Sequence, residues 1–217
     1  MKKGRVNRKV KSILKNLHTF WDFVWNGDSL LSWITFIVLA VIFIKFIFFP
    51  FLTLITGTSL PLVIVESCSM YHGERLDDFW DRKGDWYEDK GIYKEDFSSF
   101  RFKNGFNKGD IFFILGVEKG DIGIGDIIIF SGGNYGRPII HRVVGLNPLE
   151  TKGDNNPMQL GAGNGNFEQI DETDIEEWRI IGKATPIRVP YLGWAKLIFY
   201  EPFRSKEQRG FCKIDVP

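Results

Sequence analysis

The stretch "GDIIIFSGGNYGRPIIHRVVG", residues 125–145, decides the fold expected for the larger part of this chain. Two apolar runs, "DIIIF" and "IIHRVV", flank the segment "GNYGRP". β-Branched residues favour extended backbone, and Gly and Asn adopt the dihedral angles that tight turns need. The stretch therefore predicts a β-hairpin.

Short apolar runs of the same kind recur between turn residues from residue 60 to residue 200, namely "PLVIVES", "DIFFILG", "WRIIGKATPIRV" and "GWAKLIFY". This spacing is typical of a mainly β domain. Residues 71–107 differ, because they hold many acidic and aromatic residues without a clean period. We interpret them as an insertion or lid after the first strand. The segment "GAGNGN", residues 161–166, predicts a flexible loop.

A long apolar segment precedes these runs. It reads "LLSWITFIVLAVIFIKFIFFPFLTLIT", from Leu30 to Thr56, and its only charged residue is Lys45. About 20 apolar residues are enough to span the hydrocarbon core of a bilayer, so we predict a transmembrane helix. A buried core helix is seldom apolar on every face for this length. A cleaved signal peptide would have an apolar region of only about 7–15 residues nearer the start.

The charge is balanced overall, with 28 Lys and Arg against 27 Asp and Glu, which favours no nucleic-acid partner. The first 15 residues, however, carry seven basic residues and no acid. By the positive-inside rule this segment stays in the cytoplasm. We therefore expect a single-pass protein of the cell membrane, with a cytoplasmic segment at 1–28, a transmembrane helix at 29–57 and an external domain at 58–217.

The segment "VESCSM", residues 65–70, contains the candidate nucleophiles. In an extended chain alternate side chains share a face, so Ser67 and Ser69 point one way and Cys68 the other. If Ser69 is the nucleophile, Ser67 can donate to the developing oxyanion together with a backbone amide. Cys68 and Cys212 can pair or can both remain free, and two cysteines predict no disulfide framework.

A serine nucleophile needs a base, and the chain has three histidines. His18 lies on the side predicted to be cytoplasmic. His72 reaches Ser69 only if the chain turns sharply, and a surface histidine at the start of a loop is the simpler interpretation. His141 lies in a strand-like run, where it is either a general base or a half-buried structural residue. The residues alone leave both interpretations open.

The acid partner is sought in "TKGDNNP", residues 151–157. Asp154 is the candidate, although this composition also favours a simple turn. A calcium loop is a weaker alternative, because Met158 occupies the next ligand position and no Gly follows. We therefore predict neither a metal ion nor a cofactor.

With these residues in view, the chain resembles type I signal peptidases of the archaeal and endoplasmic-reticulum kind. The resemblance covers the apolar helix and essentially residues 57–200. It rests on six segments in the family's order: "TGTSLPLVIVESCSM", "FNKGDIFFILG", "GDIIIF", "RPIIHRVVG", "TKGDNN" and "IIGKATPIRVPYLGWAKL". It implies a signal-peptidase-like β domain and a serine endopeptidase that removes signal peptides from exported preproteins.

The resemblance also assigns roles to residues. It implies that Ser67 lines the oxyanion hole, that Ser69 is the nucleophile and that His141, which precedes Arg142, replaces the lysine base of the bacterial branch. Two departures concern neighbouring positions, since Cys68 stands where the family usually has Gly and Tyr71 where it usually has an acid.

A third departure concerns the acid, because Leu160 stands where the family carries a second aspartate. We favour Asp154 as the third catalytic residue. The alternative is Asp171, carried back to the site by the loop at 161–166.

The implied partners are preprotein signal peptides, membrane lipid and, as a further candidate, a Sec-type translocon. A competing hypothesis comes from another class of protein. The chain would then be a membrane-anchored β-barrel binding module or a catalytically dead relative, in which "SCSM" is only part of a strand.

Overall fold

The computed structural model describes residues 2–73, 75–132, 136–161 and 170–213. The tip of the predicted hairpin at 133–135 and most of the predicted loop at 161–166 lie outside the described residues. The chain forms two compact units, Met1–Leu52 and Thr53–Pro217.

The first unit consists of helices. Helix α1 (Lys2–Asn26) precedes α2 (Leu30–Phe43), which continues through the π-helical turn η1 (Ile44–Phe48) into α3 (Phe49–Thr56). The Ser29 hydroxyl caps α2 by accepting a hydrogen bond from the Ser32 amide at 3.1 Å. From Leu30 to Thr56 the helix is long and apolar enough to cross a membrane. Most of its large apolar side chains are exposed, as expected of a helix that packs against lipid.

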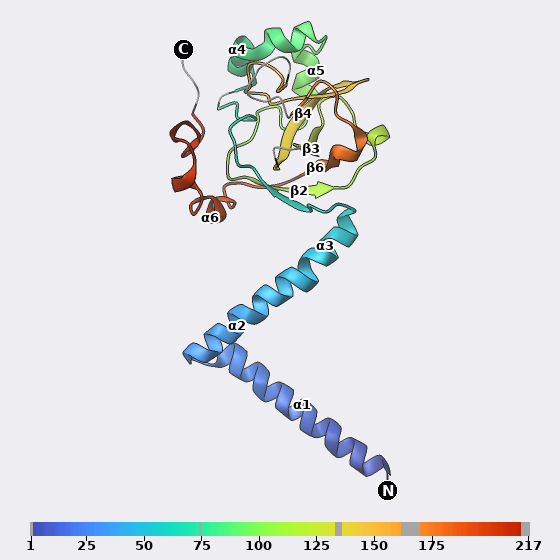
Figure 1. Ribbon diagram of the computed structural model, residues 1–217, viewed down its shortest axis with the longest axis vertical. Coiled ribbons are helices and arrows are strands. Elements are labelled where there is room, and N and C mark those ends of the chain that lie inside the picture. The colour runs from blue at the N-terminus through green and yellow to red at the C-terminus, as the bar shows by residue number, and fades with distance from the viewer. Residues whose placement is uncertain (1, 74, 133–135, 162–169, 214–217) are drawn as a thin grey trace. The chain divides into compact units, whose positions relative to one another are not determined.

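The second unit is built around an open antiparallel sheet of six strands (Figure 1). Their order across the sheet is β1 (Leu62–Ile64), β2 (Ile111–Leu115), β6 (Ile180–Val189), β3 (Ile127–Ser131), β4 (Pro138–Leu146) and β5 (Leu149–Lys152). The predicted pairing of the two apolar runs is confirmed, since β3 and β4 are antiparallel neighbours with Ile128 opposite His141.

Side chains on the two faces of the sheet enter different apolar clusters, as the two-residue period of a strand requires. On β3, Ile127 and Ile129 belong to one cluster, while Ile128 and Phe130 belong to the other. This central strand is therefore buried on both faces, which explains its unbroken apolar run.

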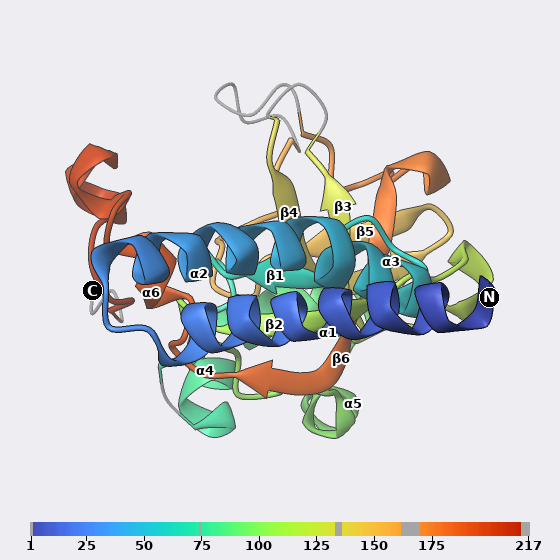
Figure 2. The same cartoon turned by 90° about the horizontal axis from the view of Figure 1, so that it is seen from below.

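The second unit is mixed α/β rather than mainly β, because residues 71–107 contain helices α4 (Leu76–Asp89) and α5 (Lys94–Ser99). Both helices lie on the same side of the sheet (Figures 1 and 2). Aromatic side chains hold them there in a buried cluster that includes Phe79, Tyr87 and Phe97 and reaches Val144 on β4. Packing of these aromatic residues, rather than a clear helical period, stabilises the insertion.

The structure also differs from the sequence-based prediction at "GWAKLIFY", residues 193–200, which was expected to be a strand. Its first residues form the short helix α6 (Trp194–Leu197). The amide of Gly193 donates to Gly109 O at 2.7 Å, which ties the start of this turn to the body of the unit. In the part of the chain that the structure describes, the remaining helical turns are of the 3-10 type: η2 (Lys119–Asp121), η4 (Glu177–Arg179), η5 (Glu201–Phe203) and η6 (Lys206–Gln208).

Cys68 and Cys212 form a disulfide between residues 144 positions apart in the chain. The sequence left this pairing open. Disulfides persist in oxidising compartments, so this bond points to an extracytoplasmic location for the second unit.

Candidate active site

Three side chains from separate segments form a continuous chain of hydrogen bonds. Ser69 Oγ lies 2.8 Å from His141 Nε2, and His141 Nδ1 lies 2.5 Å from Glu172 Oε1. An ionised carboxylate only accepts hydrogen bonds, so a neutral His141 carries its proton on Nδ1 and presents the Nε2 lone pair to the serine hydroxyl. A candidate nucleophile, a candidate base and a carboxylate suited to orient that base are therefore linked in sequence by hydrogen bonds.

Burial differs along this chain of groups. His141 is 3% exposed on β4, and Glu172 is fully buried. Ser69 is only half-buried, at the surface of the unit. Ser69 is thus partly exposed to solvent, while the imidazole and carboxylate groups behind it are buried.

Glu172 is held in place by residues of β5 and the segment that follows it. Its Oε1 accepts a hydrogen bond from Thr151 Oγ1 at 2.9 Å, and its Oε2 accepts one from the Leu160 amide at 2.7 Å. Its backbone amide donates to Leu160 O, and its carbonyl accepts from the Thr151 amide. Leu160 therefore provides only backbone groups here, and those groups position the neighbouring acid.

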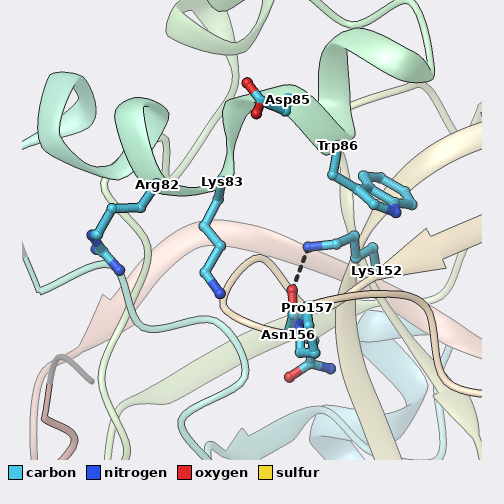
Figure 3. A pocket seen from close by; sticks show the side chains of 7 residues that line it. All are labelled: Arg82, Lys83, Asp85, Trp86, Lys152, Asn156 and Pro157. Atoms are coloured by element: carbon cyan, nitrogen blue, oxygen red, sulfur yellow. Dashed lines mark hydrogen bonds between the residues drawn. The ribbon is translucent and has the colours of Figure 1, made fainter. Parts of the chain in front are cut away.

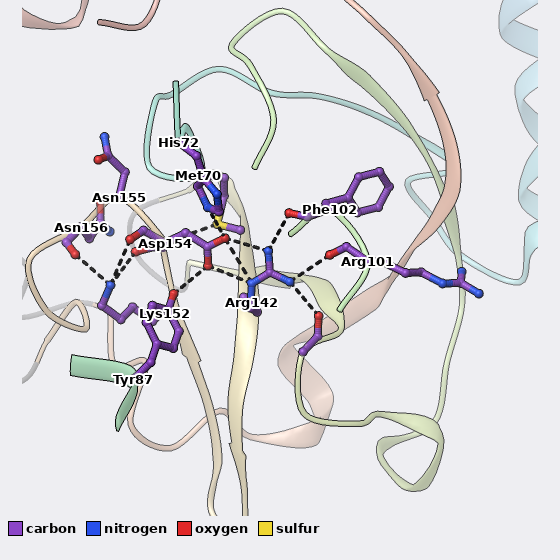
Figure 4. Close-up of polar contacts among 12 residues, drawn as sticks. Met70, His72, Tyr87, Arg101, Phe102, Arg142, Lys152, Asp154, Asn155 and Asn156 are labelled. Atoms are coloured by element: carbon purple, nitrogen blue, oxygen red, sulfur yellow. Dashed lines mark hydrogen bonds and ion pairs between the residues drawn. The ribbon is translucent and has the colours of Figure 1, made fainter. Parts of the chain in front are cut away.

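The structure does not bring the predicted acid, Asp154, into hydrogen-bond contact with His141, which is bonded to Glu172 instead. The carboxylate of Asp154 is fully buried and accepts hydrogen bonds from His72 Nε2 at 2.8 Å, Tyr87 Oη at 2.8 Å and Arg142 Nη2 at 2.7 Å (Figure 4). Burial alone would raise the pKa of Asp154, but the charge of Arg142 and the hydrogen bond from His72 hold it well below its usual range. Asp154 is thus an ionised structural group.

The alternative acid, Asp171, is not hydrogen-bonded to His141 either. Its side chain is exposed and accepts hydrogen bonds from the Thr173 amide and hydroxyl at 2.8 Å and 2.6 Å. Asp171 therefore closes a local turn. Glu172, one position further along, carries the carboxylate that reaches His141.

The loop that contains Asp154 still contributes to the site through its neighbours. The Asn155 amide donates to Ser69 O at 2.7 Å, and its side-chain amide donates to Cys68 O at 3.2 Å. A Cβ at Gly153 would lie 2.7 Å from His141 Nε2, so only glycine leaves room for the imidazole here.

The buried side chain of Lys152 stabilises this loop through hydrogen bonds to its carbonyl groups. Its Nζ donates to the carbonyls of Gly153, Asp154 and Asn156 at 3.1, 3.2 and 2.8 Å (Figure 4). Burial lowers the pKa of Lys152 to about 8. A hollow of about 270 Å³ lies between this lysine and Arg82, Lys83 and Trp86 of α4 (Figure 3), and Ser69, His141 and Glu172 do not line it.

Ser67 lies next to Ser69, as predicted, with its Oγ 3.1 Å from Ser69 Oγ. Strand β1 ends at Ile64, and a turn follows in which the Tyr71 amide donates to Cys68 O at 3.1 Å. Cys68, between the two serines, forms a disulfide with Cys212. The two hydroxyl groups therefore lie together beside the start of this turn.

The other two histidines are not at the site. His18 belongs to α1, beside Asp22. His72 was expected at the surface but is 1% exposed, and its ring stacks on Phe79 with 3.7 Å between the ring centres. The sequence-based predictions missed this burial and the contact between Glu172 and His141. The aromatic residues of 76–100 and the acidic pair at 171–172 were the available signals.

No family model matches the chain, and no curated protein matches it in sequence. The site must therefore be interpreted from its own geometry. Among the described residues, no group of three or more His, Cys, Asp or Glu side chains is arranged to hold a metal ion. The contacts of Ser69, His141 and Glu172 suit nucleophilic attack by a serine hydroxyl with imidazole as general base.

Proposed function

We propose that this protein is a membrane-anchored serine endopeptidase that removes N-terminal signal peptides from exported preproteins, as type I signal peptidases with a Ser-His pair do. The observation that supports this proposal best is the hydrogen-bonded chain from Ser69 through His141 to Glu172, with Ser67 beside the nucleophile. The resemblance in the order of the sequence segments supplies the substrate class.

The geometry supports an acyl-transfer mechanism. His141 Nε2 takes the proton of Ser69 as its Oγ attacks the scissile carbonyl carbon, and Glu172 stabilises the imidazolium that forms. The hydroxyl of Ser67 donates to the developing oxyanion. His141 then gives its proton to the leaving amine. In the second half of the reaction His141 takes a proton from a water molecule as that water attacks the acyl carbon, and it returns the proton to Ser69 Oγ as the carboxylic acid product leaves.

The proposed location follows from the apolar helix and the charges before it. Leu30–Thr56 anchors the chain in the cell membrane, the basic segment stays in the cytoplasm and the second unit works outside. The disulfide of the second unit supports this orientation. A substrate that is still held by its apolar signal segment would present its cleavage site close to this membrane surface.

The test is cleavage of a preprotein by the purified full chain in detergent, with the product ends identified by mass spectrometry. Ser69→Ala should lower the rate by about 10⁴-fold or more, since removing a serine nucleophile leaves only residual catalysis. Ser99→Ala is the matched control, because Ser99 is an exposed serine at the end of α5 whose hydroxyl donates to Asp96 O at 2.6 Å. This variant should cleave at the wild-type rate.

Normal cleavage by Ser69→Ala would refute the proposal, and the disulfide leaves Cys68 no free thiolate with which to replace it. A binding module or a catalytically dead relative would share the fold but would leave Ser69 unreactive. A serine-directed acylating probe separates these hypotheses from the proposed function. The proposed peptidase should be labelled at Ser69, and Ser69→Ala serves as the blank.

A further inference from the structure

The C-terminal segment 194–213, called here the C-terminal strap, is bonded to the residues just before the nucleophile. Cys212 forms the disulfide with Cys68. Arg204 binds Glu66 twice, because its Nη1 donates to the Glu66 carbonyl and its Nη2 to Oε2, each at 2.9 Å. The two residues that precede Ser67 and Ser69 are therefore both tied to the strap.

The strap is itself fixed to the body of the second unit by Lys108, which is 1% exposed. Lys108 Nζ lies 2.7 Å from Glu201 Oε1 and donates to the carbonyls of Gln208 and Gly210 at 2.7 and 3.2 Å. In addition, the indole of Trp194 donates to Lys108 O at 3.0 Å. The contacts of Lys108 restrict movement of the strap. The strap in turn restricts movement of Glu66 and Cys68, to which it is bonded.

The turn at Ser67–Met70 needs such support, because the strand before it is only three residues long. Asn155 donates hydrogen bonds to the carbonyls of Ser69 and Cys68. The strap supplies the contacts to Glu66 and to the Cys68 side chain. Ser69 Oγ must stay within hydrogen-bond distance of His141 Nε2, and a displacement of about 1 Å can lower a catalytic rate by about 100-fold.

We infer that the C-terminal strap positions the nucleophile of the proposed peptidase, with Cys212 and Arg204 as its positioning residues. The inference rests on the proposed function. Asn155 and the strap together hold the turn, so that Ser69 faces His141 before substrate arrives. Neither Cys212 nor Arg204 contacts the reacting atoms, so they should govern the rate of acylation and leave substrate binding largely unchanged.

The first test removes the disulfide. Dithiothreitol reduces Cys68–Cys212 to two thiols and is itself oxidised to its cyclic disulfide, and the chain contains no other cysteine for it to act on. Reduction of the folded wild type should lower kcat by about 10- to 100-fold with little change in KM, and reoxidation should restore it. Cys212→Ser should behave like the reduced wild type. The double variant Cys68→Ser/Cys212→Ser should be slow and insensitive to dithiothreitol.

The second test changes the ion pair without touching the disulfide. Arg204→Gln should lower kcat, while Arg204→Lys, which keeps the charge and one donor, should recover part of the loss. Lys206→Gln, an exposed substitution on η6 of the same strap, is the control and should retain the wild-type kcat. Thermal unfolding of each variant confirms that activity is measured on folded protein.

The inference is overturned if reduced wild type and Arg204→Gln both keep the wild-type kcat, or if only KM rises. These outcomes leave the proposed function intact. If the wild type cleaves no preprotein, the proposed function fails instead, and the rate at which an acylating probe labels Ser69 takes the place of kcat. Equal labelling with and without the disulfide would then refute the positioning role.

Discussion

At the scale of single residues, the site depends on which carboxylate lies behind His141. Asp154 and Glu172 are both fully buried, yet they have different partners. Asp154 is surrounded by Arg142, His72 and Tyr87, whereas Glu172 contacts His141 Nδ1. The charge of Asp154 is balanced by the buried guanidinium of Arg142. The carboxylate of Glu172, by contrast, is hydrogen-bonded to His141, so Glu172 is the group suited to stabilise an imidazolium there.

We predict that Glu172→Gln lowers kcat of the proposed peptidase by about 10³- to 10⁴-fold. The amide keeps the size of the side chain but removes the charge that stabilises the imidazolium and fixes its tautomer, as in other triads. The measurement is kcat for preprotein cleavage. Asp171→Asn is the control, because it changes the adjacent exposed carboxylate and should keep the wild-type rate.

The opposite pattern, with a full rate in Glu172→Gln and a loss in Asp171→Asn, would show that the segment adopts another arrangement during catalysis. A wild-type rate in both variants would show that His141 works without either carboxylate. Either result would remove Glu172 from the mechanism.

At the scale of elements, Asp154 connects parts of the fold that are distant in sequence. Its carboxylate joins the loop after β5 to Arg142 on β4 and to Tyr87 on α4 (Figure 4). His72, stacked on Phe79 of α4, completes this arrangement. The insertion at 71–107 is therefore packed onto the loop that positions Ser69, which argues against a free lid.

We predict that Asp154→Asn destabilises the second unit by about 3–5 kcal/mol, because Arg142 would remain buried without a counter-charge. Folding holds the pKa of Asp154 below its unfolded value of about 3.9, so the carboxylate stabilises the fold fully above that pH. Its contribution is lost as the pH falls further toward the lowered pKa.

Chemical denaturation of wild type and Asp154→Asn at several pH values tests both statements. The difference in the free energy of unfolding should be constant near neutrality and should shrink below about pH 4. Asp81→Asn, on the exposed surface of α4, is the control and should match the wild type. A difference that does not change with pH would contradict the assignment of the effect to the charge of Asp154.

At the scale of the whole molecule, the apolar helix and the basic segment before it predict how the protein is oriented in a membrane. Seven basic residues and no acid in the first 15 residues favour a cytoplasmic N-terminus. The Cys68–Cys212 disulfide favours an oxidising environment for the second unit.

We therefore predict that protease added to sealed right-side-out vesicles digests the second unit and spares residues 1–28. Antibodies against each end, applied after digestion, provide the measurement. Vesicles opened with detergent are the control for the susceptibility of both parts. Full protection of the second unit would reverse the orientation and would make processing of exported preproteins untenable.

The sequence by itself determined the features that depend on local pattern. The length of the apolar run predicted the long exposed helix at 30–56, and the two isoleucine-rich runs predicted the pairing of β3 with β4. The placement of Ser67, Ser69 and His141 in one site was also predicted, through the order of recognisable segments.

The tertiary structure decided which carboxylate contacts His141, that Cys68 pairs with Cys212, and that residues 71–107 form two helices. Glu172 reaches His141 because the chain returns beside Leu160 and Thr151 after a segment of glycine and asparagine, and no local period encodes such a return. Helices α4 and α5 depend on aromatic packing against β4, which is a long-range contact. Periodicity reports which face of an element is buried, whereas the partners of a buried charge depend on how distant elements are brought together.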